Sequence, residues 1–166
     1  MLTISYWGGN QLNILKNNGL EFIKFISITE EEEIFNYQPV AGSFAVIRCN
    51  EKYLMCYNIW RNQWELPSGR REGDETPKEC AKRELYEETG QVVSDLEFKG
   101  LLKSKNKTSG EIRFNPVYFT SIEKIQPFID NEETSGIKLW DLKEEIGYVD
   151  MVDIKILDCI LMLNNL

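Results

Sequence analysis

The sequence predicts a protein of the α/β (α+β) class, in which two helices pack on a mixed β-sheet. Three observations predict this class. A helix is marked at both ends at residues 77–89, a stripe of apolar side chains with helical spacing follows residue 150, and apolar segments of strand length fill much of the rest. With 166 residues, 42% of them hydrophobic and 28% charged, the chain is large enough for one domain with its own core.

The N-terminal region predicts strands. Its apolar segments are Leu2–Tyr6, Gln11–Lys16 and Glu21–Ile28, separated by Gly-Gly and Asn-Asn-Gly turn signals. They predict a small meander, and we expect residues 1–40 to form a β extension that packs on a main domain of residues 41–166. The acidic run Glu30–Glu33 is a candidate joint between the two parts.

Later apolar segments predict the central sheet and a final helix. The strand candidates are Ser43–Cys49 and Lys52–Tyr57, which flank a short hairpin connection, and Leu96–Ser104 and Glu111–Ile122, which flank a polar tip. From Asp150 onward, Val152, Ile156, Ile160 and Leu163 recur with helical spacing. This C-terminal helix should therefore pack on the sheet.

The first helix is predicted most sharply, from Pro77 to Thr89. Thr76 and Glu79 have the spacing of a capping box, Pro77 suits the first helical position, and Gly90 suits a left-handed C-terminal cap.

Three glutamates share one face of this helix. They are Glu84, Glu87 and Glu88. Like charges at these spacings cost a few tenths of a kcal/mol per pair unless a positive charge lies between them. A bound divalent cation would supply that charge.

The segment that contains this helix resembles a known family. Gly69 is followed after five residues by Glu75 and after seven more by residues 83–90, Arg-Glu-Leu-Tyr-Glu-Glu-Thr-Gly, a spacing similar to the Nudix box of MutT-like pyrophosphohydrolases. The surroundings also resemble the family: Ser43–Cys49, the Trp-Glu-Leu-Pro entry at 64–67, and a strand Ile137–Trp140 followed by a helix-like Asp141–Ile146. The resemblance implies a Nudix-like α/β/α sandwich with a mixed central sheet, here with extra N-terminal β strands.

Two positions depart from the family pattern. Gln91 stands where the box usually ends on an apolar residue, and Ser68 replaces a glycine just before the box. Val92 and Val93 are candidates for the apolar role. A solvated, Glu-rich helix is the simpler interpretation of the helix alone, but it gives no reason for Gly69, Glu75 and Arg83 to stand at these separations.

The resemblance implies a role for each box residue. Gly69, Glu84, Glu87 and Glu88 would hold the metal, Glu84 and Glu87 would also serve catalysis, and Glu75, Arg83 and Gly90 would maintain the structure of the box. Because these ligands offer only oxygen, Mg²⁺ or Mn²⁺ is the expected ion. The implied reaction is hydrolysis of a nucleoside diphosphate linked to another group, most simply a nucleoside triphosphate, oxidised or not, or a nucleotide sugar.

The general base and the substrate contacts lie outside the box. The chain has no histidine, so a carboxylate must carry acid–base work, and Glu133, beside Glu132 in a loop before the last strand, is our candidate for base or further metal ligand. A solvated acidic loop is the alternative.

Trp60 and Arg61 are the preferred substrate contacts. Other aromatic candidates for stacking on a base are Tyr6, Trp7, Tyr37, Phe44 and Tyr118, although packing in the core is the better explanation for most of them.

Composition limits the other function classes. A formal charge of −8 opposes tight binding to long nucleic acid, and no apolar run approaches the roughly 20 residues of a membrane span. The four cysteines form no Cys-x-x-Cys pair and are expected as core thiols in a reducing cytoplasm. The expected partner is a small nucleotide substrate, with a homodimer left open. The alternative function is a non-catalytic Nudix-fold module that senses a nucleotide, although the complete set of box acids argues against it.

Overall fold

A computed structural model describes residues 15–16 and 19–165 of the chain. Its elements are, in order, β1 (Leu15–Lys16), β2 (Leu20–Ile26), the 3-10 helix η1 (Glu31–Asn36), β3 (Ser43–Cys49), β4 (Lys52–Asn58), β5 (Gln63–Glu65), β6 (Ser68–Gly69), α1 (Pro77–Thr89), β7 (Glu97–Asn106), β8 (Ile112–Ile122), β9 (Thr134–Trp140), β10 (Val149–Asp150) and α2 (Met151–Asn164). The predicted strand Leu2–Tyr6 and most of Gln11–Lys16 lie outside the described residues.

The described strands form one mixed sheet, as predicted. Its order is β1-β10-β5-β4-β3-β8-β7-β2, with β6 beside β3 and β9 beside β4. The central strand β3 runs parallel to β8 and antiparallel to β4, and β7 and β8 form a long antiparallel pair. The predicted meander is wrong for the described strands, because β1 pairs with β10 and β2 pairs with β7 rather than with each other.

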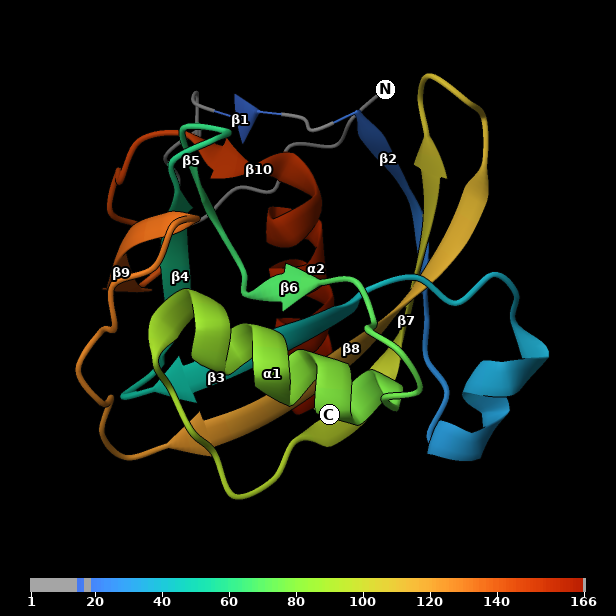
Figure 1. Ribbon diagram of the computed structural model, residues 1–166, viewed down its shortest axis with the longest axis horizontal. Coiled ribbons are helices and arrows are strands. Elements are labelled where there is room, and N and C mark those ends of the chain that lie inside the picture. Colours follow the sequence, from blue (N-terminus) through green and yellow to red (C-terminus); the bar gives the residue numbers. More distant parts are fainter. Residues whose placement is uncertain (1–14, 17–18, 166) are drawn as a thin grey trace.

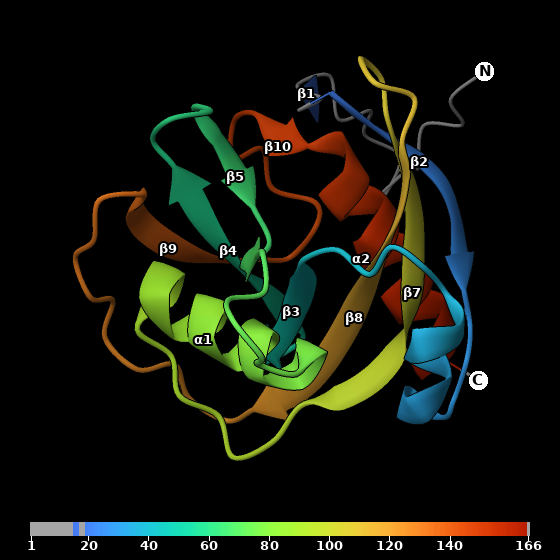
Figure 2. The same ribbon diagram turned by 45° about the vertical axis from the view of Figure 1, so that its right-hand side comes forward.

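The two helices cover opposite faces of this sheet, which confirms the α/β/α sandwich. In β3, Phe44 and Val46 point into the core under α2, whereas Ala45 and Ile47 point into the core under α1. This alternation follows from the two-residue period of a strand. Figures 1 and 2 show α1 on one side of the sheet and α2 on the other. None of the helices built from the described residues is long and apolar enough to cross a membrane.

Helix α1 begins and ends where the sequence predicts. The Thr76 hydroxyl accepts a hydrogen bond from the Glu79 backbone N–H, the Glu79 carboxylate accepts one from the Thr76 N–H, and Gly90 ends the helix with φ +80°. Just beyond it, Gln91 is only 1% exposed, and its amide exchanges hydrogen bonds with the Gln126 backbone. Of the two valines expected to replace an apolar residue there, Val93 packs on the core whereas Val92 is 63% exposed.

Two segments differ from the prediction. Asp141–Ile146 is not a helix: its turn is held by the Asp141 carboxylate, which accepts hydrogen bonds from the next backbone N–H groups at Lys143 and Glu144. In this segment the Glu144 carbonyl accepts a hydrogen bond from the Trp140 side chain, through Nε1. The acidic joint at residues 30–33 leads into a helical element, η1, whose Ile34 is buried under β7.

Candidate active site

Helix α1 presents its three glutamates to different surroundings. Glu88 is 3% exposed, the Glu84 side chain is 12% exposed, and the Glu87 side chain is 52% exposed. Glu84 and Glu88 are one helical turn apart and face strand β6, which lies over this end of β3. The structure therefore gathers Glu84 and Glu88 under β6 and leaves Glu87 at the surface.

Arg83 connects these acids to the loop that precedes the helix. Its guanidinium nitrogens donate to Glu75 at 2.7 Å, to Glu84 at 2.7 Å and to Glu87 at 3.0 Å, and also to the Arg70 carbonyl. Hydrogen bonds from Arg83 lower the pKa of Glu75 to about 2. Glu75 thus stays ionised and holds Arg83 against the loop.

Glu88 is a buried acid, and no basic side chain bonds to it within the described part of the chain. One of its oxygens accepts a hydrogen bond from the Ser68 backbone N–H at 3.1 Å, and the other faces the Cys56 thiol at 3.6 Å. Burial, followed by the negative charges of Glu133 and Glu84, raises the pKa of Glu88 to about 9. Burial also raises the pKa of Glu84, against the lowering effect of Arg83. This part of the site has more carboxylate than its own positive charges can balance.

Gly69 occupies a position that has no room for a side chain. A Cβ atom at this residue would overlap the Glu84 carboxyl group. Its carbonyl oxygen accepts a hydrogen bond from the Cys80 thiol at 3.2 Å. The glycine is needed because the backbone of β6 passes directly against the acid of the helix.

The side chains of the site are of the chemical type that binds a divalent cation, but they are not arranged around one in this structure. Within residues 15–16 and 19–165, no three His, Cys, Asp or Glu side chains are gathered closely enough to hold a metal ion as they stand. One reason is that Arg83 Nη1 lies between the Glu84 and Glu87 carboxylates. The donors are all oxygen, and the buried Glu84–Glu88 pair is destabilised by its own charge, which a hard cation would relieve. Glu87 is exposed enough to turn toward such an ion.

The structure places Glu133 near Glu88, the most C-terminal of the three acids on α1. Its carboxylate accepts a hydrogen bond from the Asn58 side chain at 3.3 Å, and its charge acts on Glu88. Burial raises the pKa of Glu133, and the positive charge of Arg61 partly offsets that rise. A rise in the pKa of a carboxylate makes it a stronger proton acceptor.

Trp60 and Arg61 lie on the same side as Glu133. Trp60 is 64% exposed, and the Arg61 guanidinium donates to the buried Glu65 carboxylate at 2.8 and 3.1 Å. Their backbone N–H groups are held by the Asn58 side chain, which also contacts Glu133. The two residues therefore border the acid group, and Arg61 serves first as the partner of Glu65.

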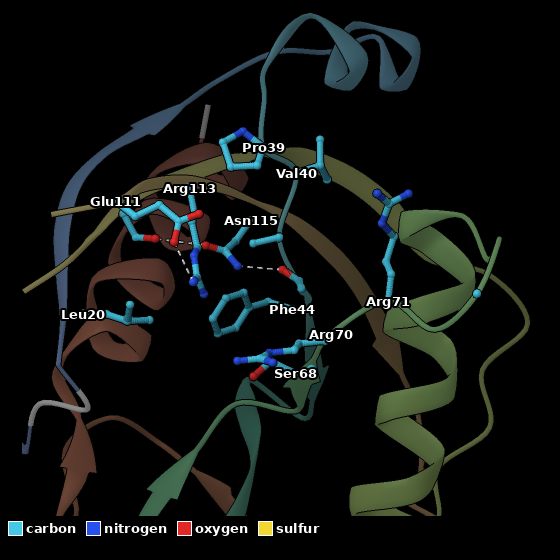
Figure 3. A pocket seen from close by; sticks show the side chains of 15 residues that line it. Leu20, Pro39, Val40, Phe44, Ser68, Arg70, Arg71, Glu111, Arg113 and Asn115 are labelled. Atoms are coloured by element: carbon cyan, nitrogen blue, oxygen red, sulfur yellow. Dashed lines mark hydrogen bonds and ion pairs between the residues drawn. The ribbon is translucent and has the colours of Figure 1, made fainter. Parts of the chain in front are cut away.

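A cavity of about 530 Å³ opens on the other side of β6, and the sequence did not reveal it (Figure 3). Its wall includes Ser68 and Gly69 from the site and Phe44, one of the aromatic candidates. Ser104 and Asn115 also line it, and both are buried polar residues. The sequence does not set them apart from the other polar residues of β7 and β8, and only the pairing of these strands brings the two together.

Comparisons with known proteins agree with this geometry. The NUDIX domain family model matches residues 37–158. The chain is 32% identical over 118 residues to the putative 8-oxo-dGTP diphosphatase YtkD of Bacillus subtilis (strain 168), a match that covers 68% of this chain and 73% of that protein.

Solved structures show a similar fold. The Bacillus subtilis pyrophosphohydrolase BsRppH superposes with a TM-score of 0.62 at 22% identity, over 86% of this chain and 90% of that one. The NUDIX domain of Shewanella oneidensis NrtR, complexed with ADP ribose, superposes with a TM-score of 0.62 at 18% identity, over 81% of this chain and 98% of that one. At these identities the two likenesses bear on the fold alone.

Proposed function

The chain belongs to the Nudix family and is a Nudix hydrolase, and from that premise we propose that it hydrolyses a phosphoanhydride bond of a nucleoside diphosphate derivative with the help of Mg²⁺ or Mn²⁺. The observation that carries the proposal is the buried Glu84–Glu88 pair, held under β6 where burial and the neighbouring acids make a second negative charge unfavourable. A protein has little reason to maintain such a pair unless a cation joins it.

Glu84, Glu87 and Glu88 would hold the ion, with the Gly69 backbone against them. When bound, the ion would neutralise charge that develops on the phosphate oxygens. The other residues keep the carboxylates in place: the Ser68 N–H orients Glu88, and Arg83 orients Glu84 while Glu75 holds Arg83. Glu75, Arg83 and Gly90 thus act by positioning.

Glu133 is the proposed general base. It would take a proton from the water that attacks phosphorus, a P–O bond of the anhydride would break, and the bridging oxygen would leave on the second phosphate. Asn58 orients Glu133 through its side-chain amide, and the positive charge of Arg61 opposes the rise in its pKa that burial causes. Glu132 is exposed and serves no role in this scheme.

The substrate class follows from the relatives as a proposal. One relative is named a putative 8-oxo-dGTP diphosphatase, and another, 35% identical over 80 residues, is named an RNA pyrophosphohydrolase of Marinomonas. Both names describe cleavage of a phosphoanhydride on a nucleotide. A nucleoside triphosphate, oxidised or not, is therefore the first substrate to test, and a nucleotide sugar the second.

A nucleotide panel tests the proposal. The protein is incubated with nucleoside triphosphates, dinucleoside polyphosphates and nucleotide sugars, with Mg²⁺ or with EDTA, and the released monophosphate, pyrophosphate and phosphate are measured. We expect Mg²⁺-dependent release of a nucleoside monophosphate, and its loss in a Glu87→Gln, Glu88→Gln double variant. Binding across the panel without turnover would instead identify a sensing module.

A further inference from the structure

The cavity beyond β6 has the size and the lining of a ligand-binding site. It lies on the α2 face of the sheet, where the apolar row that contains Leu102 and Val117 gives way to polar Ser104, Arg113 and Asn115. Figure 3 shows Phe44 and Asn115 at its centre. Its volume of about 530 Å³ is in the range of small-molecule sites.

Asn115 is fixed in the wall with hydrogen-bonding capacity to spare. The side chain belongs to a residue that is 9% exposed; its Nδ2 donates to the Gly42 carbonyl at 2.8 Å, and its Oδ1 accepts from the Ser104 hydroxyl at 3.1 Å. The Gly42 carbonyl is an acceptor only, so it defines which end of the amide is nitrogen. One N–H and one lone pair of the amide remain. This pair of groups is complementary to the edge of a base that offers a donor beside an acceptor, as adenine and cytosine both do.

The remaining wall suits a nucleotide. The Phe44 ring offers an apolar surface for a base. Three lining residues are arginines, Arg70, Arg71 and Arg113, and the acid among the described lining residues is Glu111, which pairs with Arg113 at 2.8 Å. In a chain with a formal charge of −8, this excess of positive charge favours an anionic ligand.

Three contacts connect the cavity to the acids. Asn115 bonds the Gly42 carbonyl; Gly42 lies so close to the Gly69 carbonyl that a Cβ atom would overlap it; and Gly69 lies against the Glu84 carboxyl group in the same way. Only the backbone of β6 separates the cavity from Glu84. A nucleoside in the cavity would therefore extend its 5′ phosphates past Gly69 and Arg70 toward the acids.

We propose that this cavity binds the nucleoside of the substrate, with Asn115 hydrogen-bonding to the edge of the base and Arg70 contacting the phosphates, so that the substrate is a nucleoside 5′-triphosphate recognised through its base. This inference rests on the proposed function. It assigns base recognition to Asn115 and Phe44 and leaves Trp60 and Arg61 outside the nucleoside site.

Steady-state kinetics tests it. ATP, GTP, CTP, UTP and inorganic tripolyphosphate are compared in the presence of Mg²⁺ for the wild type and for Asn115→Ala, Arg70→Gln and Arg48→Gln. Arg48 lies at the far end of β3, pairs with Glu51 and does not line the cavity, so its variant is the matched control for Arg70→Gln.

The two cavity variants have different expected signatures. Asn115→Ala should raise KM for the nucleoside triphosphates roughly tenfold or more, with kcat and the KM for tripolyphosphate nearly unchanged. Arg70→Gln should raise KM for all four nucleotides and for tripolyphosphate alike, because it removes a charge that the phosphates share. The control should match the wild type. Urea unfolding of each variant checks the fold, and if Asn115→Ala is unstable, Ser104→Ala replaces it.

Calorimetry with AMP, GMP, CMP and UMP separates this proposal from the function on which it rests. Cleavage of the nucleoside triphosphates no better than tripolyphosphate, or with wild-type KM values in both cavity variants, would overturn the nucleoside site and leave the hydrolase function in place. Binding of a nucleoside monophosphate that Asn115→Ala weakens, in a protein that cleaves no triphosphate, would support the nucleoside site and overturn the proposed reaction.

Discussion

Replacing Glu88 by glutamine should stabilise the metal-free protein while it abolishes hydrolysis. The pKa of Glu88 is raised from 4.5 to about 9, because the carboxyl group is buried beside Glu84 and Glu133 and its hydrogen-bond donors are the Ser68 N–H and the Cys56 thiol. At pH 7 the folded protein therefore keeps Glu88 protonated, whereas the unfolded chain releases the proton. Folding takes up that proton at a cost in free energy.

The size of this cost follows from the two pKa values. At 1.36 kcal/mol per pH unit, taking up the proton at pH 7 costs on the order of 3 kcal/mol relative to a group that is neutral in both states. Glutamine is such a group, and its amide would donate to Glu84 where a second acid now faces it. For a chain of this length the gain corresponds to roughly 6 to 12 °C in Tm.

Urea unfolding in EDTA between pH 5 and 8.5 measures the effect. Because the folded wild type binds one more proton than the unfolded chain above pH 4.5, its stability should fall with rising pH relative to Glu88→Gln, by about 1.4 kcal/mol per pH unit. The exposed Glu87→Gln variant is the control and should follow the wild type. Parallel curves for the wild type and Glu88→Gln would refute the argument. Mg²⁺ should stabilise the wild type and not Glu88→Gln.

Three further predictions concern neighbouring residues. Glu133→Gln should lower kcat by roughly 10²-fold or more with unchanged urea unfolding; an unchanged kcat would remove Glu133 as the base. Glu75→Gln should lose about 1 kcal/mol of stability at pH 7, after allowance for solvent screening, because the pKa of Glu75 is held at about 2 by Arg83. Since that stabilisation is present above pH 4.5 and disappears as pH falls toward 2, unfolding curves of the two proteins should converge at low pH. Gly69→Ala should lower kcat/KM at least roughly tenfold, since its methyl group overlaps the Glu84 carboxyl group, whereas Gly136→Ala, at a position with open space and ordinary φ, should match the wild type.

The elements that the sequence predicted well are those specified by neighbouring residues. Helix α1 matches its prediction at both ends because the capping box of Thr76 and Glu79 and the left-handed Gly90 act within a few residues. Strand β3 also matches, since a short apolar run bounded by turn residues has few other structures open to it.

The segment Asp141–Ile146 shows where local signals fail. Its composition permits a helix, but two of its carbonyls accept hydrogen bonds from indoles: Trp140, just before the segment, donates to Glu144, and Trp64, 82 residues away, donates to Ile146. Leu142 adopts φ +68°, which a helix excludes. The contact from Trp64 is a tertiary hydrogen bond, and a local stretch of sequence does not contain it.

The nucleoside cavity was hidden for a related reason. Ser104 and Asn115 read as ordinary polar positions within two strands, and the third member of their hydrogen-bonded group, Gly42, lies 73 residues before Asn115. Only the register that pairs β7 with β8, and β3 with β8, brings the three to one wall. Phe44 was a candidate by its type, but its position beside Asn115 needed the same pairing.

The acids themselves were found from the sequence, but the difference between them was not. Glu87 and Glu88 are adjacent and chemically identical, yet one helical step of 100° turns Glu88 under β6 and leaves Glu87 beside Arg83 in solvent. A single guanidinium nitrogen of Arg83 contacts both Glu84 and Glu87, so a divalent ion that takes oxygens from these two residues must compete with it. Glu75 holds the other side of the same guanidinium in a hydrogen bond of 2.7 Å. The loop acid would thus give Arg83 a place to remain if the helix acids turned to a metal ion, and this would account for a fourth carboxylate that touches neither ion nor substrate.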